Sequence, residues 1–95
     1  MFLVHILQCA DGSFYVGSTE HLESRVKEHN EGKLGAAYTY HRRPVTLAYS
    51  ESFDTQVKAM NRERQLKGWS HAKKEALIQG DPNTGTVFSI RDVIE

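Results

Sequence analysis

The sequence predicts an α/β domain, with a small three-stranded mixed sheet flanked by helices in the order β-β-α-β-α-α. Three observations lead to this prediction. The 95 residues suit a single domain. Two extended apolar segments near the start of the chain are separated by a turn signal, and the helical segments that follow are bounded by capping residues. We expect residues 1–80 to form the domain and residues 81–95 to form a C-terminal extension.

The first two segments are predicted to pair as an antiparallel hairpin. Residues 2–9 are mostly β-branched and aliphatic with no helical period, which is typical of a buried strand. Asp11-Gly12 favours a tight turn, and residues 13–17 contain three consecutive strand formers. These features predict a β-hairpin whose first strand is buried.

A first helix is expected to follow the hairpin. Ser18 or Thr19 can cap it, and the helix is expected to end near residues 30–32, where Asn and Gly permit a left-handed cap. Three side chains at i, i+4 and i+7 form one stripe on this helix: Leu22, Val26 and His29. That stripe is expected to face the sheet.

The second half of the chain predicts a loop, a strand and two helices. Residues 32–44 form a loop rich in Gly, Tyr, His and Arg, and residues 45–50 form the third strand. The second helix is expected to run from a cap at Asp54 to Lys67, where Gly68 ends it.

The last helix is expected over residues 71–79, capped by Ser70 and ended by Gly80. Residues 87–90 are a possible short strand in the C-terminal extension. The helical residues predicted to lie in the core are Val57, Met60, Leu66, Leu77 and Ile78, with Trp69 as an anchor between the last two helices.

The charge pattern permits two interpretations. The net charge of zero weakens the electrostatic argument for nucleic-acid binding, because strong non-specific binders carry a positive excess. The charge is nevertheless uneven, since residues 61–74 hold five basic side chains and a single acidic one, Glu63. A basic binding face and an ordinary solvated helix surface both fit this pattern.

Composition also indicates a location. No apolar run approaches the roughly 18–20 residues that span a membrane. Cys9 is the single cysteine, so the chain cannot form an internal disulfide, and we expect a cytoplasmic protein in which Cys9 is a buried apolar residue. The sequence contains no P-loop and no dinucleotide-binding fingerprint, so no nucleotide cofactor is expected.

An ordered set of motifs runs through the predicted domain. Tyr15-Val16-Gly17-Ser18-Thr19 is followed by Arg25-x-x-x-His29 on the first helix and by Glu63 on the second. In this order and spacing the chain resembles the GIY-YIG nuclease superfamily, and in particular its small stand-alone bacterial branch. The resemblance extends over about residues 2–78 and includes Arg42-Arg43-Pro44-Val45. The superfamily includes excision-repair nucleases, homing endonucleases, restriction enzymes and junction resolvers.

The resemblance implies a role for each motif residue in metal-dependent cleavage of DNA. Tyr15 would act on the nucleophilic water, Arg25 on the phosphate, and His29 on the proton, while Glu63 would hold Mg²⁺ or Mn²⁺. These residue types suit those tasks. A guanidinium pairs with phosphate as a planar fork, an imidazole titrates near neutral pH, and Mg²⁺ needs few carboxylates because it keeps several waters.

His5 departs from the family pattern. The first half of the signature normally ends in tyrosine, but the matching segment here is Leu3-Val4-His5. An imidazole can act as a general base or position a water, so His5 is a candidate catalytic residue. The substitution also fits a member that has lost cleavage, or a specialised branch that acts on a different nucleic acid.

Further residues are candidates for nucleic-acid binding. Residues 38–43 interleave aromatic and basic side chains, a composition suited to base stacking with phosphate contact on single-stranded or structured DNA. With the basic residues of the last two helices, the predicted set is Tyr38, Tyr40, Arg42, Arg43, Arg62, Lys67, Lys73 and Lys74.

Two other functions remain open at this point. A non-catalytic nucleic-acid-binding module on the same fold would bind in a salt-sensitive manner without cleaving. A protein-interaction domain, which the neutral net charge permits, would not bind nucleic acid even at low salt.

Overall fold

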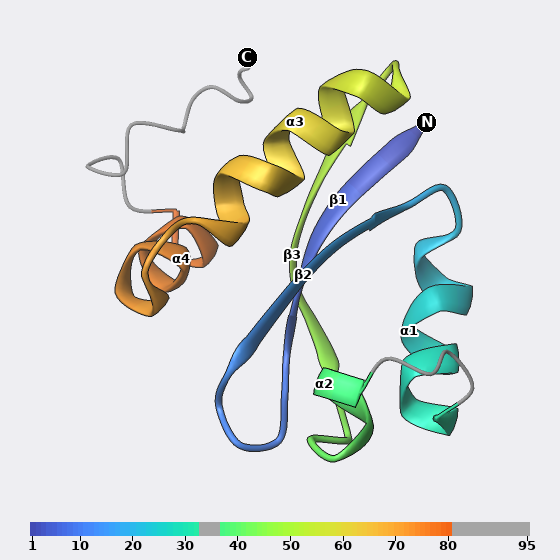
Figure 1. Cartoon of the computed structure of the whole chain (residues 1–95), viewed down its shortest axis with the longest axis vertical. Helices are drawn as coiled ribbons and strands as arrows, with labels where there is room; N and C mark the ends of the chain where they lie inside the picture. Colours follow the sequence, from blue (N-terminus) through green and yellow to red (C-terminus); the bar gives the residue numbers. More distant parts are fainter. Residues whose placement is uncertain (33–36, 81–95) are drawn as a thin grey trace.

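Three strands form one sheet in the order β2-β1-β3 (Figure 1). β1 spans Phe2–Gln8, β2 spans Phe14–Thr19 and β3 spans Thr46–Phe53. The computed structural model describes residues 1–32 and 37–80, so the strand predicted at 87–90 lies outside the described residues. The predicted α/β fold with a small three-stranded sheet and flanking helices is confirmed.

Both neighbours of β1 run antiparallel to it, so the expectation of a mixed sheet was wrong. β2 and β3 do point in the same direction, as strands joined through a helix usually do. β1 lies between them, however, and every hydrogen-bonded pair is therefore antiparallel. The direction of the third strand follows from the helical connection, while its place beside β1 could not be read from the sequence.

The turn between β1 and β2 forms where the sequence predicted it. The Cys9 N–H donates to the Ser13 carbonyl at 2.8 Å, and Gly12 adopts a φ of +89°, which an L side chain rarely tolerates. Asp11 Oδ1 accepts from the backbone N–H and the hydroxyl of Ser13. This turn fixes the register in which His5 lies opposite Gly17.

α1 spans Leu22–Glu31 and ends at Gly32, whose φ of +73° gives the expected left-handed cap. Its start differs from the prediction. β2 continues through Thr19, and the residue at the cap position is His21, which makes no side-chain capping bond. The Thr19 hydroxyl instead accepts from the His21 N–H at 3.0 Å, so Thr19 orders the approach to the helix.

Three further helices complete the described chain: α2 over Ala37–Tyr40, α3 over Gln56–Lys67 and α4 over His71–Ile78. α2 lies within the segment predicted as a loop. α3 is capped by the Thr55 hydroxyl, which accepts from the Lys58 N–H, and not by Asp54. The cap of α4 at Ser70 is confirmed.

The helices cover the two faces of the sheet, with α1 on one side and α3 and α4 on the other (Figure 1). On the α3 side, the core contains Val4 and Ile6 of β1 with Leu66 and Leu77. On the α1 side, Leu7 packs with a second group that comprises Cys9, Val45, Tyr15 and Val26. Because side chains alternate along a strand, His5 falls on the α1 side.

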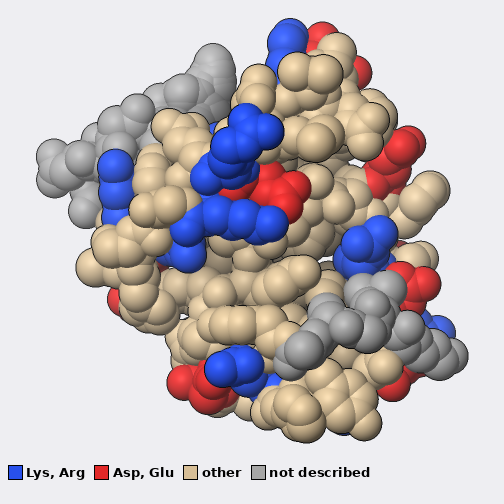
Figure 2. Space-filling model, in the orientation of Figure 1, with Lys and Arg blue, Asp and Glu red and all other residues tan. Residues whose placement is uncertain are grey.

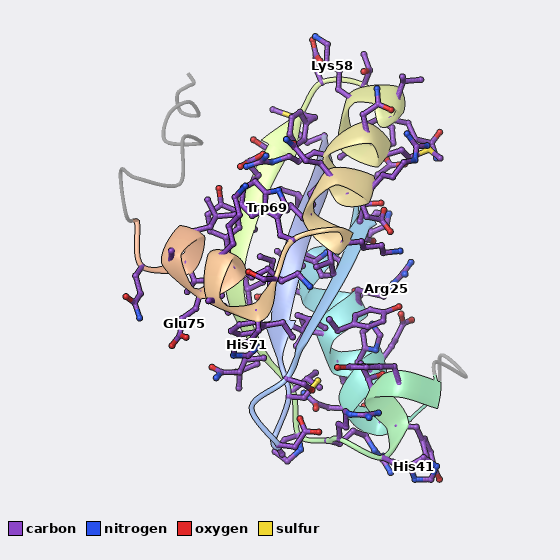
Figure 3. The ribbon with its side chains drawn as sticks, turned by 60° about the vertical axis from the view of Figure 1, so that its left-hand side comes forward. Arg25, His41, Lys58, Trp69, His71 and Glu75 are labelled. Atoms are coloured by element: carbon purple, nitrogen blue, oxygen red, sulfur yellow. The ribbon has the colours of Figure 1, made fainter. Side chains whose placement is uncertain are left out.

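Two core predictions on α3 were wrong. Val57 is 67% exposed and Met60 is 46% exposed, whereas Ala59 and Leu66 of the same helix are buried. Small Ala59 allows α3 to approach the sheet closely, and the apolar stripe is therefore rotated from the one predicted. Trp69 is half-buried against the α3-side core, as expected, and lies between α3 and α4 (Figure 3). Within the described residues, no helix is long and apolar enough to cross a membrane.

Candidate active site

His5 and Tyr15 lie on adjacent strands beneath α1, with Gly17 directly across from His5. A Cβ atom added to Gly17 would lie 3.0 Å from His5 Nε2 and 3.6 Å from the Tyr15 ring. Such a contact is tighter than ordinary packing allows, so glycine at position 17 leaves the space that the imidazole fills. The Tyr-Val-Gly motif thus brings an imidazole against the β2 backbone beside Tyr15.

His5 is a buried and incompletely bonded histidine. It is 1% exposed, and its Nδ1 atom has no hydrogen-bond partner among the described residues. The pKa of His5 is lowered from 6.5 to about 4, mainly by burial, and the charges of His29 and Arg25 act in the same direction. His5 is therefore neutral near pH 7, and its Nδ1 keeps an unused capacity for one hydrogen bond.

His29 links α1 to α2 and contacts Tyr15. Its Nδ1 lies 2.8 Å from the Thr39 hydroxyl, and its ring meets the Tyr15 ring edge-on at 5.2 Å. Burial lowers the pKa of His29, and the Arg25 charge lowers it further, so this imidazole is also mainly neutral near pH 7. Thr39, itself buried, was not predicted as a site residue, because its contact with His29 spans ten residues.

The stack of aromatic rings continues outward from Tyr15. Tyr38 of α2 packs on Tyr15 with ring centroids 5.9 Å apart, and the Arg42 guanidinium lies 4.1 Å from the Tyr38 ring centroid. Arg42 also forms an ion pair with Asp11 at 3.0 Å. Tyr38 and Arg42 of the predicted nucleic-acid-binding set therefore adjoin Tyr15.

Arg25 is on the first turn of α1, at the end of the helix nearer α3 (Figure 3). Its side chain is 41% exposed and lies 3.8 Å from Glu28, a distance at which a surface ion pair contributes little. Arg25 lines a hollow of about 260 Å³ together with Ser18 and Thr19 of β2 and Ala59 of α3. A substrate in this hollow would meet the guanidinium.

Glu63 reaches the same region from α3. The Ser18 hydroxyl donates to Glu63 Oε1 at 2.7 Å, and Lys67 Nζ lies 2.8 Å from Oε2. Partial burial raises the pKa of Glu63, but hydrogen bonds from Lys67 and Ser18 outweigh it, so the net pKa lies below the usual range. Glu63 is therefore ionised at neutral pH, and its charge reaches His5. Ser18 is a second site residue that sequence reasoning missed, because 45 residues separate it from Glu63.

The chemistry of these donors fits one type of metal ion. Among the described residues, no group of three or more His, Cys, Asp or Glu side chains could enclose a metal. Mg²⁺ and Mn²⁺ bind carboxylate oxygen, and Mg²⁺ commonly keeps several waters and uses one or two carboxylates. A single ionised Glu63 fits such an ion, although the Lys67 ammonium, 56% exposed, would have to leave Oε2.

Other predicted binding residues lie away from this site. Arg62 makes a half-buried double contact with Glu51 at 3.0 and 3.2 Å and lies 5.2 Å from the Trp69 ring centroid. These contacts make Arg62 part of the α3-side packing, so its guanidinium already has a carboxylate partner. Lys73 lies over Trp69 at 4.3 Å, and Lys74 belongs to the same helix. Figure 2 shows basic side chains over the α3 region with acidic ones beside them.

The geometry defines a class of protein: a small α/β domain in which two neutral histidines and a tyrosine lie beneath one helix, near an arginine that lines a shallow hollow and one ionised carboxylate. Residues 1–76 match the family model for the GIY-YIG catalytic domain. The chain therefore belongs to the GIY-YIG family. Membership indicates a nuclease with a DNA substrate, and such nucleases generally use divalent metal ions.

Several relatives are similar over most of their length. A UPF0213 protein of Halobacterium salinarum is 49% identical over 82% of this chain and all of its own. One of Syntrophus aciditrophicus is 46% identical over 83% of this chain and 91% of its own. A solved structure, the solution NMR structure of a UPF0213 protein from Bacillus halodurans, has a TM-score of 0.54 and 39% identity. It covers 94% of this chain and 98% of that one.

Proposed function

We propose that this protein is a Mg²⁺- or Mn²⁺-dependent endonuclease that hydrolyses phosphodiester bonds in single-stranded, branched or damaged DNA. The observation that carries the proposal is the convergence of His5, Tyr15 and His29 beneath α1, beside a hollow lined by Arg25 and by Ser18, which donates to Glu63. These residues come from four separate elements. An ordinary core has no need to gather two neutral histidines and an ionised carboxylate there.

Hydrolysis adds one water across a P–O bond. The water oxygen joins phosphorus, the bond to the sugar oxygen breaks, and that oxygen takes up a proton. Tyr15, whose ring contacts His29, would orient the water through its hydroxyl, and neutral His29 would accept the proton that the water loses. His5, packed against Gly17, supports the water or the Tyr15 hydroxyl with its neutral imidazole.

Arg25 supplies the fixed positive charge of the site. Its half-exposed guanidinium lines the hollow between the starts of α1 and α3, where it can donate to two phosphate oxygens. The transition state carries more charge on those oxygens than the substrate does, so this interaction favours the reaction. Ser18, which lines the same hollow, donates to Glu63 and holds its carboxylate nearby.

Glu63 is the residue proposed to hold the divalent ion. When bound, the ion would stabilise negative charge on the phosphate and lower the energy of the leaving oxygen. Ser18 fixes one carboxylate oxygen in orientation, which leaves the other for the ion once Lys67 moves. Lys67 would then be free to contact the DNA backbone.

The proposed substrate follows from the size of the site. The chain is small, and Tyr38 with Arg42 offers a stacking surface next to Tyr15. A stacking surface accepts a base whose face is uncovered, as in single strands, branches and lesions. Long-site sequence recognition would need a larger surface than these residues provide.

The test is cleavage of labelled single-stranded, duplex and branched DNA with Mg²⁺ or Mn²⁺. Glu63→Gln, which keeps the size of the side chain but removes its charge, should lower the rate at least about 100-fold. Glu75→Gln is the matched control, because Glu75 is an exposed glutamate on α4 (Figure 3). Calorimetry with Mn²⁺ should show weaker binding to Glu63→Gln only. Equal cleavage by both variants would contradict the proposal.

The second candidate function is a nucleic-acid-binding module without cleavage. His5 favours it, because this position normally holds tyrosine in the family and an imidazole with a pKa of about 4 is a weak base. It predicts salt-sensitive binding by the wild type and no cleavage with either metal.

A further inference from the structure

The short helix α2 presents two tyrosine–arginine pairs to two different places. Tyr38 pairs with Arg42 and adjoins Tyr15, as described above. Tyr40 pairs with Arg43, whose guanidinium carbon lies 4.3 Å from the ring centroid. The candidate active site uses the first pair, and the second has no part in it.

The second pair lines a hollow of about 490 Å³. Its walls come from the end of α1, the last residue of α2 and the segment after it: Asn30, Tyr40, His41, Arg43 and Pro44. Tyr40 is 45% exposed, and the His41 ring meets it edge-on at 5.0 Å. Figure 3 shows His41 at the end of the molecule opposite Lys58, beside α2.

Backbone contacts hold the Tyr40–Arg43 pair in place. Arg43 Nε donates to the Tyr40 carbonyl at 2.8 Å, and Nη1 donates to the Asn30 carbonyl at 3.2 Å. A Cβ atom at Gly32 would lie 2.9 Å from the Tyr40 ring and 3.0 Å from Arg43 Nη1. Glycine at this position therefore leaves room for the stacked pair, whose planar groups are fixed before any ligand arrives.

The polar groups around the hollow differ in whether their hydrogen bonds are already made within the protein. The Asn30 side-chain amide is occupied, because it donates to the Val45 carbonyl and accepts from the Val45 N–H. Within the described residues, the Arg43 guanidinium donates to two carbonyl oxygens and forms no ion pair with a carboxylate. The hollow thus combines an exposed ring, a fixed cationic plane and an exposed imidazole.

We propose that this hollow binds the base of an unpaired DNA nucleotide on the strand that passes Tyr38 to reach the active site. The inference rests on the proposed function for the identity of that strand. Aromatic rings and guanidinium planes stack on bases, and the Arg43 charge attracts the adjoining phosphate. A base within a duplex has both faces covered by its neighbours, so the hollow selects single-stranded or splayed DNA.

The test is binding of fluorescently labelled single-stranded DNA and a matched blunt duplex, measured by anisotropy in EDTA so that cleavage cannot occur. Tyr40→Leu keeps an apolar side chain against Gly32 but has no aromatic face. It should weaken single-strand binding about 5- to 100-fold and change duplex binding less than about twofold. Tyr40→Phe should bind like the wild type, as should Val57→Ala, which changes an exposed residue of α3.

Several results would overturn the inference: unchanged single-strand binding by Tyr40→Leu, an equal loss on both DNA forms, or an equal loss in Tyr40→Phe. A wild type that binds no single-stranded DNA would also overturn it. Because the assay contains no metal, its outcome is separate from the nuclease proposal. If the protein binds as expected but never cleaves DNA, the proposed subsite stands and only the proposed reaction is contradicted.

Photo-crosslinking gives an independent measurement that does not depend on the folding of a variant. Single-stranded DNA that carries 5-iodouracil should crosslink to the wild type, and mass spectrometry should locate the attachment at Tyr40 or His41. Attachment exclusively to residues of α3 or α4 would contradict the proposed subsite.

Discussion

The two faces of β1 are buried to the same degree but by different kinds of side chain. On the α3 side, Val4 and Ile6 are fully buried among apolar neighbours such as Leu66. On the α1 side, Leu7 is fully buried, yet its neighbour on the same face is His5, which is 1% exposed with an unpaired nitrogen. A buried polar atom without a partner costs stability. The α3 side therefore contributes most of the apolar packing, and the α1 side gives up part of its stability for the histidine and tyrosine residues of the candidate site.

The largest stability effect is expected from the α3 side. Leu66→Ala removes a fully buried side chain, leaves a cavity, and should lower the free energy of unfolding by about 2–5 kcal/mol. Val57→Ala, on the same helix but 67% exposed, should change it by less than about 0.5 kcal/mol. Urea unfolding followed by circular dichroism measures both. Similar losses in the two variants would mean that the α3-side core is not the one described.

An intermediate effect on the free energy of unfolding is expected from His5 when the pH is lowered. Burial is the main cause that lowers the pKa of His5 from 6.5 to about 4. Between pH 4 and pH 6.5 the unfolded chain therefore binds more protons than the folded one. The stabilising contribution of neutral His5 is complete above about pH 6.5 and is lost as the pH falls toward 4. Between pH 7 and 5 the loss should be on the order of 1–2 kcal/mol.

The variant His5→Phe separates this contribution from that of His29, whose pKa is lowered in the same direction. Unfolding free energies of the wild type and the variant, measured at pH 7, 6 and 5, should differ in slope. If His5→Phe loses as much stability as the wild type over this range, the buried neutral histidine is not the cause.

The smallest effect on stability is expected from a substitution at the start of α4. Ser70→Ala removes the hydroxyl that accepts from the Lys73 N–H and should cost about 1 kcal/mol of stability. Because α4 packs on the α3 side only, cleavage of DNA should stay at the wild-type rate at a temperature where both proteins are folded. A large loss of activity would mean that the two sides are coupled more strongly than their contacts indicate.

Local signals allowed much of the fold to be predicted. The Asp11-Gly12 turn, the Gly32 cap and the Ser70 cap depend on residues close together in sequence, and all three occur as expected. Features that depend on distant contacts were missed. The placement of β3 beside β1 requires the whole path of α1 and α2, and the orientation of α3 depends on small Ala59 at the sheet.

In the candidate site too, features with a sequence motif were predicted and features that depend on distant contacts were missed. His5, Tyr15, Arg25, His29 and Glu63 were singled out by motif order, and the structure brings them to one region. Ser18 and Thr39 were missed as partners of Glu63 and His29, since a hydroxyl gives no sign in sequence of which distant side chain it will meet. Arg62 was assigned to DNA because its charge is visible in the sequence while its partner Glu51 on β3 is not.

The most direct test of the central claim is the rate of DNA cleavage by Tyr15→Phe, measured with its free energy of unfolding. The substitution removes one hydroxyl on the α1 side and leaves the ring that packs against His29 and Tyr38. We predict a loss of cleavage of about 100-fold or more, with stability within about 1 kcal/mol of the wild type. Cleavage at the wild-type rate would contradict the assignment of this face as the active site.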